Sequence, residues 1–209
     1  IRRRGHSKDH RPDRVQIVVG VVMSRAGWPL ACEVYRGNQA DVKLVEPLIK
    51  VVQERLSLGR VILVLDRGFT SRANLTAIMK SGLDYIVGAR LRRNKEVREE
   101  VLTQAGPYQE VSKNLKVREV KIGEKRYIVC WNPEEAIRNE RERTAMLAAL
   151  SERLAQGGAK SLLGNRGYAR YVQIERGAVK IKPTAVEDEK RFDGIYVLET
   201  NTALGAVEA

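Results

Sequence analysis

The stretch VILVLDRGF, residues 61–69, places an aspartate and an arginine directly after five consecutive aliphatic residues. A strand with one face in water shows a polar residue at every second position, so this continuous run predicts a strand covered on both faces. Asp66 then stands where the strand leaves the core, which is where open α/β sheets place their chemistry. A carboxylate at that point either accepts hydrogen bonds in a turn or acts as a ligand, and this stretch alone leaves both interpretations open.

The residues around this strand alternate between strand and helix patterns. Segment 15–23 is rich in β-branched residues and predicts a strand, and segment 30–35, which follows after a turn, predicts its antiparallel neighbour in a hairpin. Apolar residues then recur at helical spacing from 45 to 56, and again between Ser71 and Gly82. A short strand follows at 84–91. The order of two strands, helix, strand, helix, strand predicts a mixed sheet with helices packed on it.

The pattern changes near residue 92, which predicts two domains, 1–91 and 92–209. The second is expected to be β-rich, with one highly charged helix at 134–156 and a connection at 156–167. Its predicted strands are 116–123 and 125–131, which form a hairpin, together with 171–181 and 194–200.

The composition indicates a basic, intracellular protein. Lysine and arginine number 38 against 26 aspartate and glutamate, and the formal charge of +12 favours an anionic partner, most simply nucleic acid. Aromatic residues make up only 5% of the chain, so contacts with duplex phosphates are expected rather than extensive stacking on bases. No segment is apolar over the length of a membrane span, and the first residues lack a secretory signal, so we expect no membrane association and a cytoplasmic location.

Histidine and cysteine offer no metal cluster in the sequence. The two cysteines, Cys32 and Cys130, lie far apart in apolar stretches and are expected to be buried and unpaired. The only histidines, His6 and His10, lie in a basic polar arm. A metal site in this chain would therefore depend on carboxylate oxygens.

Five segments together resemble bacterial insertion-sequence transposases of the DDE type. They occur in the same order as in that family and span nearly the whole chain: GHSKDHRPDRVQ (5–16), RGNQAD (36–41), VILVLDRGFTSRANL (61–75), DYIVGARL (84–91) and DGIYVLETN (193–201). The resemblance is to the branch in which a β-rich insertion interrupts a catalytic core. It implies a ribonuclease-H-like α/β fold, with a mixed sheet and flanking helices in residues 1–91 and the insertion in 92–209.

The resemblance also implies a metal role for Asp66. In this family two aspartates and a glutamate bind divalent metal, and the second aspartate ends a central strand, as Asp66 does in VLDRGF. The implied cofactor is Mg²⁺ or Mn²⁺, the implied partner is double-stranded DNA at element ends and target, and a homodimer is expected. Two Mg²⁺ ions held by hard oxygen ligands suit in-line displacement at phosphorus.

The other two metal ligands of the family have no convincing counterpart here. Asp9 and Asp13 lie in a polar loop, Glu199 lies on the last predicted strand, and Glu208 follows a sequence that departs from the family. We therefore expect a transposase fragment that neither cleaves nor joins DNA alone. The alternatives are a non-catalytic nucleic-acid-binding remnant, in which Asp66 is only structural, and a nuclease that only hydrolyses.

The remaining candidate residues surround Asp66 or belong to basic groups. Asn38 and Asp41 are either near the metal or serve as turn and helix-cap residues. Arg67 either contacts a phosphate or neutralises Asp66. The preferred DNA-binding group follows the predicted strand 84–91 and consists of Arg90, Arg92, Arg93 and Lys95; two further basic groups are Arg2, Arg3 and Arg4, and Lys8, His10 and Arg11.

Overall fold

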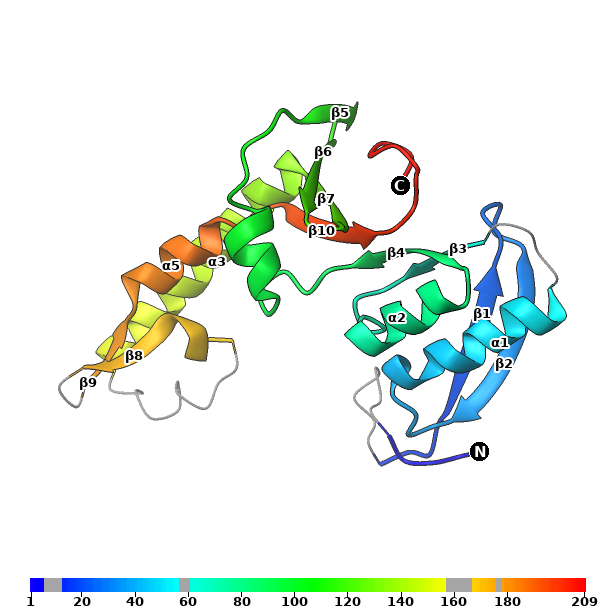
Figure 1. Ribbon diagram of the computed structural model, residues 1–209. Helices are drawn as coiled ribbons and strands as arrows, with labels where there is room; N and C mark the ends of the chain where they lie inside the picture. The colour runs from blue at the N-terminus through cyan, green and yellow to red at the C-terminus, as the bar shows by residue number, and fades with distance from the viewer. Residues whose placement is uncertain (6–12, 57–60, 157–166, 176–177) are drawn as a thin grey trace. The chain divides into compact units, whose positions relative to one another are not determined.

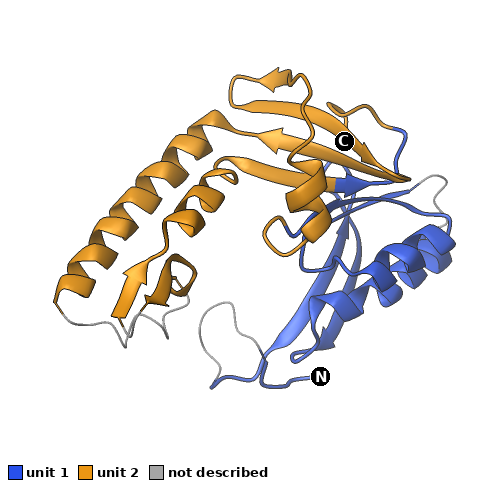
Figure 2. Ribbon diagram, turned by 60° about the vertical axis from the view of Figure 1, so that its left-hand side comes forward, with its two compact units in different colours: residues 1–90, 199–203 blue, residues 91–198, 204–209 orange. Residues whose placement is uncertain are grey.

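The computed structural model describes residues 1–5, 13–56, 61–156, 167–175 and 178–209 (Figure 1). These residues form two compact units (Figure 2): unit 1 contains residues 1–90 and 199–203, and unit 2 contains 91–198 and 204–209. The assignment of these units to a catalytic core and an insertion stays a prediction. Nearly all of the predicted connection 156–167 lies outside the described residues, as do His6, Lys8, Asp9, His10 and Arg11.

Unit 1 begins with the predicted hairpin. Strand β1 (Ile17–Met23) pairs in antiparallel fashion with β2 (Pro29–Arg36), and Gly27 takes the positive φ of 83° in the turn between them. The sequence prediction of this hairpin is confirmed. Alternate side chains on one face of the hairpin are exposed, and most of them are apolar: Ile17, Val19, Val21, Met23 and Val34.

Two helices form the core of unit 1 with a parallel strand pair. A 3-10 helix, η1 (Asp41–Leu44), leads into α1 (Val45–Arg55), and α2 is Arg72–Lys80. As predicted, Ser71 caps α2, because its hydroxyl oxygen accepts a 3.1 Å hydrogen bond from the Asn74 amide. The buried cluster joins both helices to strands β3 and β4, and its members are Val45, Ile49, Val52, Leu63, Leu75, Ile78, Leu83, Tyr85 and Val87.

Strand β3 (Ile62–Leu65) is parallel to β4 (Asp84–Gly88), and the end of β10 (Ile195–Thr200) follows β4 in the sheet. Within the described residues β3 pairs only with β4, so it is a terminal strand. The expectation that Asp66 ends a central strand is therefore wrong. The expectation that this strand is covered on both faces is wrong as well, as its side chains show. Leu63 packs into the core on the helix side, whereas Val64 points the other way and is 75% exposed.

Unit 2 contributes the strand order β10-β7-β6-β5 to the sheet, and β5, β6 and β7 are mutually antiparallel. Its further strands are β5 (Gln109–Ser112), β6 (Leu115–Ile122) and β7 (Lys125–Trp131). The predicted hairpin of β6 and β7 is confirmed, with Gly123 at a φ of 57° in its turn. β7 lies between two strands, and its central residues, from Tyr127 to Cys130, are all buried.

The rest of unit 2 is built around α3 (Pro133–Ala155), close to the predicted helix 134–156. Asn132 caps α3 by accepting a 3.1 Å hydrogen bond from the Glu135 amide. A second hairpin, β8 (Val172–Glu175) and β9 (Ala178–Ile181), leads into α5 (Pro183–Lys190), a helix that the sequence patterns did not reveal. The described part of unit 2 also contains two short helical turns, the π-helix η2 (Val97–Val101) and the 3-10 helix η3 (Ala169–Tyr171).

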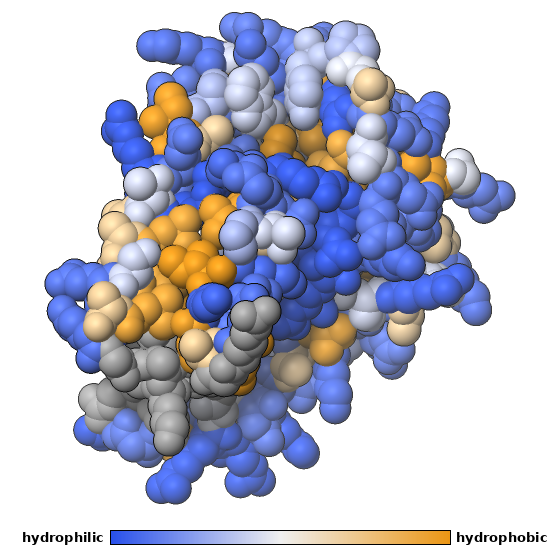
Figure 3. Space-filling model, turned by 90° about the vertical axis from the view of Figure 1, so that its left-hand side faces the viewer, coloured by the Kyte–Doolittle hydropathy of each residue, from blue (hydrophilic) through white to orange (hydrophobic). Residues whose placement is uncertain are grey.

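The surface of this part of the chain is mostly hydrophilic. Seen from the side on which β8 and β9 lie in Figure 1, hydrophilic residues surround one larger apolar area and several smaller ones (Figure 3). Inside unit 2, Leu150 of α3, Tyr171 and Val172 form a buried cluster, with partly buried apolar residues packed around it. No helix among the described residues has the length and apolar character needed to cross a membrane.

The two cysteines differ in their surroundings. Cys130 of β7 is buried and unpaired, as predicted, whereas Cys32 of β2 is exposed, so that prediction is wrong. The reason is the register of the hairpin, which places Cys32 opposite Val21 on the exposed face. The mixed α/β class is confirmed by the parallel β3–β4 pair, the antiparallel pairs and the helices, while the ribonuclease-H-like arrangement stays a prediction.

Candidate functional site

Asp66 stands at the end of β3, in an exposed turn. Its Oδ1 accepts a 2.7 Å hydrogen bond from the Arg67 amide, and its carbonyl oxygen accepts one of 3.0 Å from the Phe69 amide. The first of these contacts supports the interpretation of Asp66 as a turn aspartate. Asp66 nevertheless forms no ion pair with the described residues, and its Oδ2 accepts no hydrogen bond from them. One carboxylate oxygen is therefore available to a ligand.

The turn that carries Asp66 is fixed to the end of β4. The Thr70 hydroxyl donates a 3.1 Å hydrogen bond to the Gly88 carbonyl, and Arg90 Nε donates one of 3.3 Å to the Arg67 carbonyl. The two segments are also close in space, since a β-carbon added at Gly88 would lie 3.4 Å from the Arg67 amide nitrogen. The carboxylate is therefore mounted on a well-defined segment although β3 is a terminal strand.

Asp41 lies beside this turn. A β-carbon added at Gly68 would lie 3.4 Å from Asp41 Oδ2, which places the Asp41 carboxylate against the segment that follows Asp66. The interpretation of Asp41 as a helix cap is wrong, because neither η1 nor α1 has a side-chain cap. Asn38 is exposed in the turn after β2, and no hydrogen bond joins it to Asp66 in the part of the chain that the structure describes.

Asn74 is a residue of this site that the sequence analysis missed. Its Nδ2 donates a 2.7 Å hydrogen bond to the Val42 carbonyl and one of 2.8 Å to the Phe69 carbonyl. These acceptors belong to η1 and to the Asp66 turn. The only sequence signal was its place three residues after the cap residue Ser71, where a polar side chain commonly turns back toward the helix start.

The donor atoms at this site suit a divalent cation in kind but are few. Asp41 and Asp66 supply hard carboxylate oxygens, which Mg²⁺ prefers, and Mg²⁺ usually keeps several waters or takes phosphate oxygens as its other ligands. The described residues contain no group of three histidine, cysteine, aspartate or glutamate side chains arranged to hold a metal ion. The residues therefore fit an ion bound through one or two carboxylates.

The other acidic residues considered from the sequence lie in different surroundings. Glu199 is buried, and its Oε1 accepts a 3.3 Å hydrogen bond from the Tyr85 hydroxyl. Tyr85 lies near the start of β4, where it pairs with Leu63 of β3. Burial and the nearby Glu199 charge raise the pKa of Tyr85. Asp13 lies 3.5 Å from Arg14 Nε, and Glu208 Oε2 accepts a hydrogen bond from the Gly205 amide. Asp9 lies outside the described residues.

The predicted DNA-binding arginines of unit 1 are exposed. Arg67 forms no ion pair with Asp66 within the described part of the chain, so the interpretation that it neutralises that carboxylate has no support. Arg90 is held through its Nε contact with the Arg67 carbonyl, and it forms no ion pair with the residues that the structure describes. Both guanidinium groups thus keep N–H donors that can reach a phosphate.

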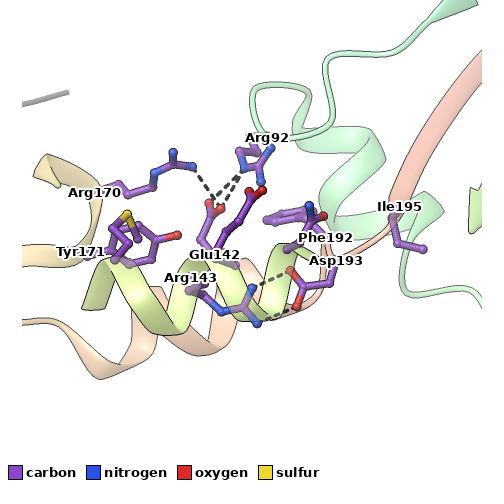
Figure 4. Close-up of a pocket in the computed structure, with 11 residues that line it drawn as sticks. Arg92, Glu142, Arg143, Arg170, Tyr171, Phe192, Asp193 and Ile195 are labelled. Carbon is purple, nitrogen blue, oxygen red and sulfur yellow. Dashed lines mark hydrogen bonds and ion pairs between the residues drawn. The ribbon is translucent and has the colours of Figure 1, made fainter. Parts of the chain in front are cut away.

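The predicted residues of unit 2 differ from one another. Arg92 lines a pocket of about 330 Å³, where its Nε donates to both carboxylate oxygens of Glu189 at 2.9 and 3.2 Å (Figure 4). Its guanidinium also lies 5.2 Å from the centre of the Phe192 ring. Arg93 is exposed, and Lys95, 83% exposed, lies 3.7 Å from Glu99. Arg92 therefore has a structural role that Arg93 and Lys95 lack.

The charges in this pocket are balanced by ion pairs. Arg170 shares Glu189 with Arg92 at 3.1 Å, and Arg143 forms a two-pronged pair with Asp193 at 2.5 and 2.6 Å. The hydrogen bonds that Arg143 donates to Asp193 raise the pKa of Arg143. The pocket is lined by equal numbers of positive and negative side chains, namely Arg92, Arg143 and Arg170 with Glu142, Glu189 and Asp193. It is not a simple anion site.

Comparison with protein families gives a match over much of the chain. The family model described as Transposase DDE domain matches residues 2–137, which is more than half of the chain. Comparison with curated proteins and with solved structures finds no match.

Proposed function

The chain belongs to the DDE transposase family, and from that premise we propose that Asp66 is a metal ligand for DNA cleavage and strand transfer. A divalent ion at such a site supplies Lewis-acid stabilisation and activates the attacking oxygen in displacement at phosphorus. The observation that carries the proposal is the exposed Asp66 carboxylate. It ends β3, keeps one oxygen without a partner among the described residues, and stands in a turn that Asp41 contacts.

The protein groups have distinct roles in this proposal. Asp66 supplies a ligand oxygen from the end of β3, and Asp41 lies close enough to the same turn to bind a water of the ion or the ion itself. Arg67 and Arg90, with exposed guanidinium groups at this turn, contact DNA phosphates. The formal charge of +12 favours the approach of DNA. A homodimer and a cytoplasmic location stay predictions.

Two carboxylates bind Mg²⁺ weakly and do not hold two ions in register. We therefore expect the 209-residue chain alone to neither cleave nor join DNA. Magnesium-dependent strand transfer by the purified chain, abolished by Asp66→Ala, would contradict this expectation. It would also show that the remaining ligands lie within the 209 residues.

A non-catalytic, nucleic-acid-binding remnant is the second candidate. One observation favours it: Asp66 Oδ1 already bonds to the turn backbone, as a purely structural aspartate would. In that case DNA binding would persist, and divalent cations would make no difference at Asp66.

Binding of Mn²⁺, followed by electron paramagnetic resonance, distinguishes the two candidates. We expect Asp66→Asn to weaken the tightest Mn²⁺ site at least several-fold. The matched control is Glu54→Gln, which removes the same charge from an exposed position on α1. Equal Mn²⁺ affinity in the wild type and Asp66→Asn would favour the remnant and reject the metal role of Asp66.

A further inference from the structure

We propose that Asn74 is a positioning residue, which holds Asp41 beside the Asp66 turn so that both carboxylates reach one divalent cation. The inference rests on the proposed metal role of Asp66. It adds a requirement that the family match does not contain, namely that a side-chain amide on α2 sets the spacing of the two acidic segments.

The Asn74 amide uses both of its hydrogens. Nδ2 donates to the Val42 carbonyl at 2.7 Å and to the Phe69 carbonyl at 2.8 Å. Among uncharged side chains, only asparagine and glutamine carry two N–H donors on one atom. A single amide therefore joins two segments that lie far apart in the sequence.

The two carbonyls that accept hydrogen bonds from Asn74 belong to residues next to the contact between Asp41 and Gly68. Val42 directly follows Asp41, and Phe69 directly follows Gly68, which is the residue that Asp41 Oδ2 approaches. Shifting either carbonyl would therefore move the Asp41 carboxylate relative to the turn of Asp66. The two hydrogen bonds fix a relation between segments that neither β3 nor η1 can fix by itself.

The bridge is anchored on a rigid element. Asn74 lies in the first turn of α2, and its backbone amide donates to the cap residue Ser71 at 3.1 Å. The next residue, Leu75, is part of the buried core with Ile78. The position of the Asn74 side chain is therefore set by core packing rather than by the loops that it joins.

Nuclear magnetic resonance of the ¹⁵N-labelled chain with added Mn²⁺ tests this role, because paramagnetic broadening falls steeply with distance from the ion. In the wild type, the amide signals of Gly68 and Val42 should broaden together as Mn²⁺ is added. In Asn74→Ala, Gly68 should still broaden, whereas Val42 should need several-fold more Mn²⁺. If Asn74 only stabilised the fold, Gly68 and Val42 would still broaden at the same Mn²⁺ concentration.

Two further variants make the test specific. Gln53→Ala is the matched control, since Gln53 Nε2 also donates to a backbone carbonyl of unit 1, that of Ser81 at 3.0 Å, away from the acidic segments. In Gln53→Ala, the Gly68 and Val42 signals should still broaden at the same Mn²⁺ concentration. Asp41→Asn removes a carboxylate without touching the bridge, so it should weaken Mn²⁺ binding several-fold while both signals still broaden together.

Three results would overturn the inference. If Gly68 and Val42 broaden at the same Mn²⁺ concentration in Asn74→Ala, the Asn74 amide does not set the spacing between Asp41 and the Asp66 turn. Loss of the folded state in Asn74→Ala, seen by circular dichroism, would show that Asn74 supports the fold as a whole. If Gly68 does not broaden even in the wild type, the proposed metal role of Asp66 fails too, which separates that failure from the first two.

Discussion

Strands β3 and β7 have similar sequences but opposite surroundings. β3 carries ILVL and β7 carries YIVC at its centre, and neither alternates between apolar and polar residues. In β7 all four of these residues are buried, whereas in β3 Val64 is 75% exposed. The two strands also differ in pairing, because β7 lies between β6 and β10 and the described part of the chain gives β3 only β4. The exposure of Val64 shows that no described element packs over that face of β3, whereas both faces of β7 are covered.

The comparison teaches that an apolar run predicts a strand but does not determine how that strand is covered. β7 stabilises unit 2, and its end leads into the capped start of α3. β3 contributes mainly Leu63 to a core, and its end presents an exposed carboxylate. We therefore expect changes in β7 to affect stability, and changes at the end of β3 to affect metal binding.

Truncating a β7 side chain should have the largest effect on stability. Ile128 is 1% exposed, so Ile128→Ala leaves a cavity and should reduce the free energy of unfolding of unit 2 by about 3 kcal/mol. Urea denaturation followed by circular dichroism measures this loss. Val64→Ala in β3 is the paired variant, and because Val64 is largely exposed it should cost less than about 0.5 kcal/mol. Equal losses in the two variants would refute the comparison.

The ion pairs of the unit 2 pocket give the next largest effect. Arg143→Gln removes the guanidinium that donates two hydrogen bonds to the Asp193 carboxylate. The Arg143 side chain is only 8% exposed. We expect a loss of about 2 kcal/mol in the urea denaturation of unit 2. Arg138→Gln on the same helix is the control, since its side chain is 63% exposed and its pairs should contribute less than about 1 kcal/mol. A negligible effect of Arg143→Gln would mean that the pocket does not depend on this pair.

The basic residues extend the comparison to DNA binding. Arg93 is exposed and has no ion pair among the described residues, so Arg93→Gln should reduce the slope of log affinity against log salt by about one unit. Arg92 is committed to Glu189 and Phe192, so Arg92→Gln should reduce that slope by clearly less. Fluorescence anisotropy with a DNA duplex at several salt concentrations measures both slopes. Unchanged slopes would remove Arg92 and Arg93 from the DNA surface.

The smallest predicted effect concerns Glu119 of β6, which lies opposite Ile128 in the sheet. A hydrogen bond from Arg126 lowers the pKa of Glu119, although partial burial opposes this shift. A lowered pKa stabilises the folded state above the ordinary carboxyl pKa of about 4.3, and this stabilisation is lost as the pH falls through the lowered value. Wild type and Glu119→Gln should therefore differ in melting temperature at pH 6 and converge at lower pH. A constant difference across this range would contradict the assignment.

Elements with strong local signals were predictable from the sequence. The β1–β2 and β6–β7 hairpins and the Ser71 cap followed from alternation, turn glycines and capping residues. These features depend on neighbours in the sequence. The prediction of α3 succeeded for the same reason, because apolar residues recur along it at helical spacing.

Features that depend on distant partners were not predictable. The exposure of Cys32 follows from the register of the hairpin, and that of Val64 from the lack of a described element over its face of β3. Helix α5 escaped detection because none of its residues is buried, so it lacks a clear apolar stripe. Asn74 escaped because its two acceptors are backbone carbonyls of distant segments, which leave no trace in local composition.

The most direct test of the central claim is a crystal of this chain soaked in Mn²⁺, with the ion located by its anomalous scattering. The account predicts a peak about 2 Å from Asp66 Oδ2, close to the Asp41 carboxylate and absent from crystals of Asp66→Asn. An Asp66 carboxylate without a peak in crystals that bind Mn²⁺ elsewhere would contradict the assignment of this residue as a metal ligand.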